Sequence, residues 1–310
     1  MDIPFLGELL ALISAACYGF SAVAISKNAE AGGTANGAYL SVVLTAALAG
    51  GLWLVMGRPL PPAGGPLYQG LLFSALAGVL ANVFGRVVMF RATELLGAVE
   101  IGILRRLIPV FAALFAVVFL SERITAAMGL GFALIFAAVA IVIATAPPDT
   151  RSAATPARAR SRAPGDLRRG RLLGAASSAS YAGSYVSRKF ALQGLPDPLM
   201  GTFIGAVTGL LCAGAIALVS PRGRSDLRAL LRRPSRWETV AAASVSAGQI
   251  VLFFALNHAD VTVVAILGSV EIFVAAWLSA LLLKTEHRPG PGFAVASLLA
   301  LAGTAIIAAR

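Results

Sequence analysis

The chain has 310 residues and a formal net charge of +11, and 58% of its residues are hydrophobic while only 13% are charged. A soluble protein carries about a quarter charged residues, so this composition excludes a soluble globular domain and indicates a protein that lies in a lipid bilayer. Thirteen of the 25 lysines and arginines lie in residues 151–171 and 222–236, mostly between apolar runs, where they would face an anionic membrane surface. We therefore expect no nucleic-acid partner.

Ten apolar runs follow one another along the chain, each close to the ~20 residues needed to cross a bilayer. A backbone exposed to lipid has to satisfy its own hydrogen bonds, so each run is predicted to be a helix. The predicted spans are 5–26, 38–56, 69–91, 97–120, 125–146, 171–190, 199–219, 237–257, 261–283 and 290–309. The first run lacks a basic region before it, which argues against a cleaved signal peptide.

Residues 147–170 are rich in Pro, Ala, Ser and Arg and have no apolar period, so they are predicted to be a linker between two halves. The first span of each half carries the same spacing of serine and tyrosine: Ser14, Tyr18 and Ser21 in one, Ser177, Tyr181 and Ser184 in the other. This match predicts an internal repeat.

The predicted fold is an all-α membrane protein of ten transmembrane helices, five in residues 1–146 and five in residues 171–310. Because five is an odd number, the second half enters the membrane from the opposite side. Such inverted repeats are typical of secondary transporters, which place the substrate site near the midplane between the halves.

Charge counting gives a prediction for orientation. Seventeen lysines and arginines lie in the loops after odd-numbered spans, and five lie on the opposite side of the membrane. Arg188 and Lys189 are two of these five. The positive-inside rule then puts both termini outside the cytoplasm.

Three charged residues lie deep inside predicted spans: Arg105 and Arg106 in the fourth and Glu271 in the ninth. Charges at such depth usually face the bundle interior or water. Glu100 is not three or four residues from either arginine, so their partner must lie on another helix or on a substrate. We expect one arginine to pair with Glu271, and an arginine to bind a substrate carboxylate or phosphate through paired hydrogen bonds. A purely structural ion pair is the alternative.

Other polar groups complete the set of candidate substrate-binding residues. The two serine–tyrosine faces can line a central cavity, or the small serines can serve close helix packing. Asn82, Arg86 and Gln249 offer hydrogen bonds within the third and eighth spans, and Trp277 in the ninth could stack against a flat ligand.

Glu122 and Glu286 each lie at a span junction just before the next helix starts, where an anion suits the positive N-terminal end of that helix's dipole, so a capping role is predicted for both. Gly201, Gly205 and Gly209 form a ridge of small residues in the seventh span. This ridge predicts a close helix contact, within the bundle or between subunits.

Residues 104–124, with Pro109 and Glu122, and residues 264–286, with Glu271 and Glu286, resemble the fourth-helix signature of the EamA-like group of the drug/metabolite transporter superfamily. The resemblance implies a ten-helix fold and export or exchange of small metabolites, amino acids or drugs. Phe273 stands where the first segment has Pro109, so the ninth span is predicted to lack a kink. The group is commonly drawn with cytoplasmic termini, so the orientation stays open.

We predict a secondary transporter that exports amino acids or related small organic compounds by alternating access between the repeats. A flippase or transporter for a lipid-linked or phosphorylated substrate is the alternative. Histidines and cysteines are few and scattered, so we expect no enzyme, no metal site and no cofactor. The abundance of Arg, Ala and Gly suggests a bacterial inner-membrane protein, which we expect to be a monomer or a weak homodimer.

Overall fold

The computed structural model describes residues 5–30, 37–96, 101, 103–145, 164–221, 223–224, 228, 233–279 and 291–308. In chain order its elements are α1 (Leu6–Glu30), α2 (Gly37–Met56), α3 (Gly65–Val79), η1 (Leu80–Gly85), α4 (Arg86–Leu96), η2 (Arg105–Leu107), α6 (Ile108–Leu120), α7 (Ala126–Thr145), α9 (Pro164–Gly194), α10 (Pro198–Val219), α12 (Arg236–His258), α13 (Val261–Gly268), α14 (Glu271–Leu278) and α15 (Pro291–Ala308). The short elements η1 and η2 are a π-helical and a 3₁₀ turn.

The helices are apolar enough to lie in a membrane, as the composition predicts. In the part of the chain that the structure describes, six helical segments are long and hydrophobic enough to cross a bilayer, and α7 and α15 contain shorter apolar helices. These described residues therefore confirm a helical multi-pass membrane protein. The count of ten spans goes beyond these six segments and stays a prediction.

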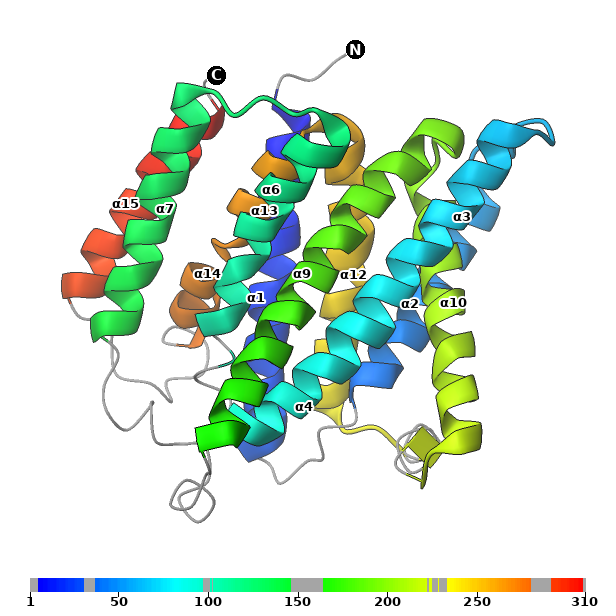
Figure 1. The fold of residues 1–310 in the computed structure, drawn as a ribbon, viewed down its shortest axis with the longest axis horizontal. Coiled ribbons are helices and arrows are strands. Elements are labelled where there is room, and N and C mark those ends of the chain that lie inside the picture. The colour runs from blue at the N-terminus through cyan, green and yellow to red at the C-terminus, as the bar shows by residue number, and fades with distance from the viewer. Residues whose placement is uncertain are drawn as a thin grey trace.

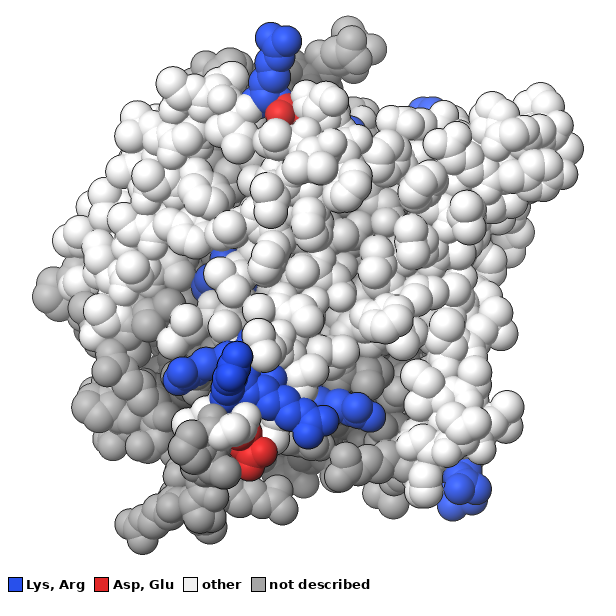
Figure 2. All heavy atoms as spheres, viewed as in Figure 1, with Lys and Arg blue, Asp and Glu red and all other residues white. Residues whose placement is uncertain are grey.

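The most extensive packing joins helices from the two halves of the chain (Figure 1). Helix α1 packs against α12 and α14, whereas α9 packs against α3, α4 and α6. Helix α2 packs against α10, and α7 against α15. Figure 1 also shows that α1 begins at the end of the bundle where both termini lie, while α9 begins at the opposite end. On the face shown in Figure 2, most lysine and arginine side chains gather at the end away from the termini.

Glycines allow α10 to approach its neighbours closely. A methyl group added at Gly201 would lie 2.7 Å from the ring of Phe253. At Gly205 it would lie 3.2 Å from the Ser74 carbonyl oxygen, and at Gly209 it would lie 2.8 Å from the Asn82 side chain. The close contact predicted for Gly201, Gly205 and Gly209 is thus confirmed, and it lies within the bundle.

The ninth predicted span is broken between α13 and α14. The amides of Ser269 and Val270 donate to carbonyls three residues earlier, at 3.0 Å each, which tightens the backbone into a 3₁₀ turn. The unkinked helix expected from Phe273 in place of proline is therefore wrong. Gly268 and Ser269 have weak helix propensity, so a break here needs no proline.

Two helices extend beyond their predicted bounds. The third span consists of α3, η1 and α4, which follow one another without a gap and extend beyond the predicted 69–91 at both ends. Helix α9 begins at Pro164, seven residues before the predicted start at 171. Proline in the first turn and Asp166 close behind it are typical of a helix start.

Glu122 connects the end of α6 to the start of α13 through hydrogen bonds. Ser121 has a left-handed backbone (φ 56°) that ends α6. The Glu122 carboxylate then accepts hydrogen bonds from the Val261 amide (2.7 Å), the Thr262 amide (3.1 Å) and the Thr262 hydroxyl (2.7 Å). Glu122 therefore caps a helix, as predicted, but one in the other half of the chain. Glu286 lies outside the described residues.

Replacing Glu122 by alanine is expected to lower the stability of the purified protein by about 2 kcal/mol, because three donors at the start of α13 lose their acceptor. The measurement is thermal unfolding in detergent. Glu122→Gln keeps one carbonyl oxygen and should fall between the alanine variant and the wild type. Equal midpoints for all three proteins would contradict the capping role.

Candidate substrate site

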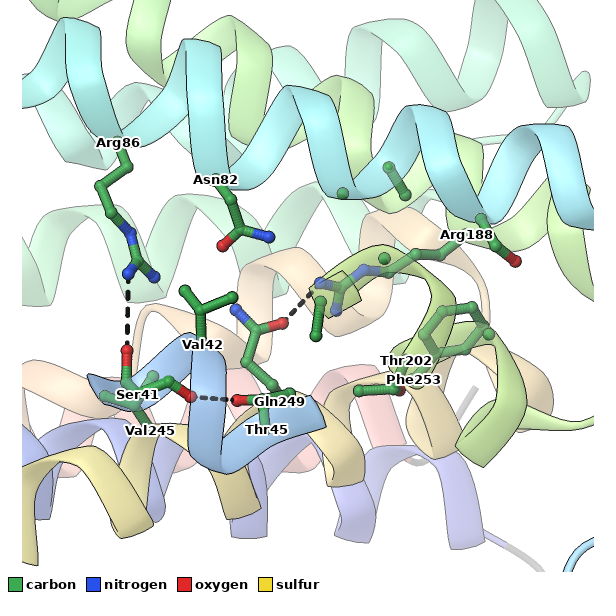
Figure 3. A pocket seen from close by; sticks show the side chains of 16 residues that line it. Ser41, Val42, Thr45, Asn82, Arg86, Arg188, Thr202, Val245, Gln249 and Phe253 are labelled. Atoms are coloured by element: carbon green, nitrogen blue, oxygen red, sulfur yellow. Dashed lines mark hydrogen bonds between the residues drawn. The ribbon is translucent and has the colours of Figure 1, made fainter. Parts of the chain in front are cut away.

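A polar pocket lies between helices of both halves (Figure 3). It is lined by Ser41, Val42, Thr45, Ser74, Ala77, Gly78, Asn82, Arg86, Arg188, Gly201, Thr202, Gly205, Ala206, Val245, Gln249 and Phe253. Its volume is about 20 Å³, which is room for about one water molecule. In this conformation the pocket is therefore too small for a metabolite.

Arg188 is the most deeply buried charge of the pocket, with 7% of its surface exposed. One guanidinium nitrogen donates to Oε1 of Gln249, and the guanidinium lies 5.4 Å from the centroid of the Phe253 ring. Its other terminal nitrogen, Nη1, has no hydrogen-bond partner among the described residues. Figure 3 shows the side chain reaching from α9 into the pocket toward Gln249.

A second polar group joins the two halves at their helix breaks. Nη1 of Arg106, on η2, lies 3.5 Å from Oε1 of Glu271, at the start of α14, and the two side chains are 19% and 23% exposed. Helix α1 comes so close to α14 that a methyl group at Gly19 would lie 2.8 Å from the Glu271 carbonyl oxygen. Irregular backbone at such depth is tolerated where it lines a site inside the protein.

Arg105 and three tyrosines lie near this ion pair. Arg105 is exposed, yet it is within electrostatic range of Glu271, Tyr181, Tyr185 and Tyr18. It therefore lines a part of the interior that water reaches. Tyr18 is within electrostatic range of both Arg188 and Glu271. Tyr18 therefore lies between the pocket, whose lining includes Arg188, and the ion pair, which the pocket lining does not include.

The family model of the EamA-like transporter family matches residues 5–144 and 168–309. The chain belongs to the EamA-like transporter family. No curated protein matches this EamA-like chain. One solved structure, reported as a crystal structure of a protein, superposes with a TM-score of 0.73 at 17% identity, covering 98% of this chain and 96% of that one. At that identity the likeness shows the fold alone. The family assignment makes this EamA-like protein a membrane transporter of the drug/metabolite superfamily.

The serines of the two predicted polar faces bind backbone in this EamA-like protein. Ser14 donates to the Gly248 carbonyl (2.9 Å), and Ser177 donates to the Gly85 carbonyl (2.7 Å). Further along the same helices, Ser21 and Ser184 each donate to the carbonyl of the tyrosine three residues earlier. These hydrogen bonds favour the helix-packing alternative for the serines and leave the tyrosines as the polar groups of these faces.

Three of the predicted residues, Asn82, Arg86 and Gln249, line the pocket together. Nη1 of Arg86 lies 3.5 Å from the Ser41 hydroxyl oxygen. Asn82 lies on the π-helical turn η1, a feature frequent at functional sites, and no sequence signal in this EamA-like chain indicates that turn.

Two further predicted residues pack against neighbouring helices. The ring of Tyr181 would lie 3.0 Å from a methyl group at Gly85. Trp277 donates to the Ser297 hydroxyl (3.3 Å) and meets the Phe293 ring edge-on. Trp277 therefore packs against α15 instead of the residues that line the pocket.

The charge count assigns Arg188 to the side of the termini, although this arginine lies within the predicted span 171–190. In the structure of this EamA-like protein, α9 continues to Gly194 and Arg188 is buried inside the bundle. Its spacing is a usable signal, because Arg188 follows Tyr181 and Ser184 by seven and four residues and so shares their face of the helix.

Proposed function

We propose that this protein exports amino acids or related small organic compounds across a bacterial inner membrane. In this proposal transport proceeds by alternating access between two inverted five-helix repeats. The observation that carries the proposal is the ion pair between Arg106 and Glu271, which joins the halves at two helix breaks.

An amino acid carries the same two charges as this pair. Its carboxylate suits an arginine guanidinium, and its ammonium group suits Glu271, so the substrate can replace each partner while the interior stays neutral. The pair is also open to exchange. Its 3.5 Å separation is longer than the ~2.8 Å of a strong charge-assisted hydrogen bond, and both side chains are partly exposed.

The packing of the helices supports alternating access. The contacts of α1 with α12 and α14 correspond to those of α9 with the third and fourth spans of the first half. The opposite directions of α1 and α9 in Figure 1 agree with an inverted repeat. The basic end of the bundle in Figure 2 supports cytoplasmic loops there and termini on the outside.

A ligand screen followed by a transport assay tests the proposed function. The thermal midpoint of the purified protein is measured against amino acids, nucleosides, phosphorylated metabolites, cationic drugs and polyprenyl phosphates. A ligand at ~100 times its dissociation constant adds about 2.7 kcal/mol of stability. Compounds that bind are then tested for counterflow in proteoliposomes.

We expect amino acids to stabilise the wild type and the control Arg123→Ala, whose changed side chain is exposed at the end of α6. We expect no stabilisation of Arg105→Ala, which loses a guanidinium beside the ion pair. Stabilisation by polyprenyl phosphates alone would favour the flippase. Amino acids that bind without counterflow, or that bind Arg105→Ala equally well, would contradict the proposed function.

A further inference from the structure

Two buried polar atoms of the pocket have no hydrogen-bond partner among the residues that the structure describes. They are Nη1 of Arg188 and Oγ of Ser74, and the Ser74 side chain is fully buried. Both residues line the pocket of Figure 3. Leaving a buried donor unsatisfied destabilises a protein, and buried polar groups nearly always have a partner, so two such donors in one pocket indicate a bound species.

The charge of the pocket selects the kind of species. The groups that act on Arg188 electrostatically are Tyr18 and Tyr185, and none of the sixteen lining residues is acidic. An isolated buried cation is expensive, especially within a membrane, unless an anion compensates it. Gln249 offers Arg188 only the partial charge of an amide oxygen. The pocket therefore favours an anion over a water molecule.

Its size limits the anion to a very small one. The volume of about 20 Å³ admits one species of about the size of water and excludes an amino acid. The Thr202 hydroxyl already donates to the Pro198 carbonyl (2.7 Å). Ser74 and Arg188, in contrast, each keep a buried polar atom with no hydrogen-bond partner among the described residues.

We propose that this pocket binds one chloride ion, held by Nη1 of Arg188 and the hydroxyl of Ser74. The pocket is lined by α2, α3, η1 and α4 from the first half and α9, α10 and α12 from the second. The ion therefore stabilises the packing of the two halves in this conformation, and it does so whatever compound the protein transports.

The test compares chloride with gluconate, which is too large for the pocket, at constant ionic strength. The thermal midpoint of the purified protein is measured while chloride replaces gluconate up to about 0.1 M. We expect a saturable rise of about 5 °C, because the ion binds the folded state only. Bromide should act similarly and give an anomalous diffraction peak beside Arg188 in crystals.

Three variants assign the effect to the pocket. Arg188→Met should lose the chloride effect and be at least as stable as the wild type in gluconate, since an uncompensated buried charge is removed. Ser74→Ala keeps the charge and should need about tenfold more chloride, which corresponds to one hydrogen bond. Arg233→Gln, at an exposed arginine near the start of α12, should keep the full effect.

A wild-type midpoint that is equal in chloride and gluconate, together with no bromide peak, would overturn the proposal and leave water in the pocket. A chloride effect that survives Arg188→Met would overturn it too. Stabilisation through Arg188 by acetate or glycine, but not by halides, would show that the pocket binds the carboxylate of an organic compound.

Discussion

Exchanging the charges of Arg106 and Glu271 is expected to restore most of the transport that either single reversal removes. Arg106→Glu alone sets two carboxylates against each other, and Glu271→Arg alone adds a guanidinium beside Arg105 and Arg106. Breaking a buried ion pair costs about 3–5 kcal/mol of stability. This pair is partly exposed, so the cost is reduced to about 2 kcal/mol, which corresponds to a loss of about 30-fold in the population of the paired state. The double exchange recreates an attractive pair and should recover most of that loss.

Counterflow of a transported compound and the thermal midpoint should both be measured, since the midpoint reports the pair without any substrate. The matched control exchanges Arg105 and Glu271 instead. Because the ion pair is made by Arg106, the control should not recover. A double exchange at Arg106 and Glu271 that is no better than the worse single variant would show that the two side chains act independently.

Gly78→Ala is expected to destabilise the protein strongly, by more than an added methyl group at any of the three α10 glycines Gly201, Gly205 and Gly209. The added carbon would overlap the carbonyl oxygen of Gly205, which is backbone and cannot move aside alone. Helices α3 and α10 would have to separate, and overpacking of this kind costs about 1–3 kcal/mol or more. Because Gly78 also lines the pocket, the chloride effect should weaken with the packing.

Gly214→Ala is the control, because it makes the same change on α10 at a position with nothing within 4 Å. It should unfold at or slightly above the wild-type temperature, since alanine favours a helix. Both variants are compared with the wild type by their thermal unfolding midpoints and by the yield of folded protein. Equal midpoints would show that α3 and α10 do not cross as closely as the structure places them.

The sequence was sufficient to predict that Glu271 pairs with an arginine of the fourth span. Depth in the membrane and the lack of a nearby carboxylate require a partner on another helix. The choice between Arg105 and Arg106 could not be predicted. Adjacent side chains differ by ~100° around a helix, and the 3₁₀ turn at η2 sets which of them faces α14.

The roles of other site residues depend on contacts with helices far away in the sequence, which local sequence patterns do not reveal. The serines could face a cavity or a neighbouring backbone, and only the position of Gly85 and Gly248 on the adjacent helices decides between the two. The charge count assigned Arg188 to the side of the termini, although Arg188 lies inside the predicted span 171–190. Such a count uses only position along the chain, whereas the burial of Arg188 depends on α9 continuing to Gly194 and on the helices packed around it.

Helix α1 packs mainly against α12, α2 against α10, and α7 against α15. When the ribosome has synthesised only residues 1–146, these first-half helices therefore lack their packing partners. The hydrogen-bond donors to Glu122 are also absent at that point, because they lie on α13, about 140 residues later in the chain. We therefore expect that neither half folds stably without the other. Two separately expressed halves should be degraded when alone and should accumulate only when both are present in one cell.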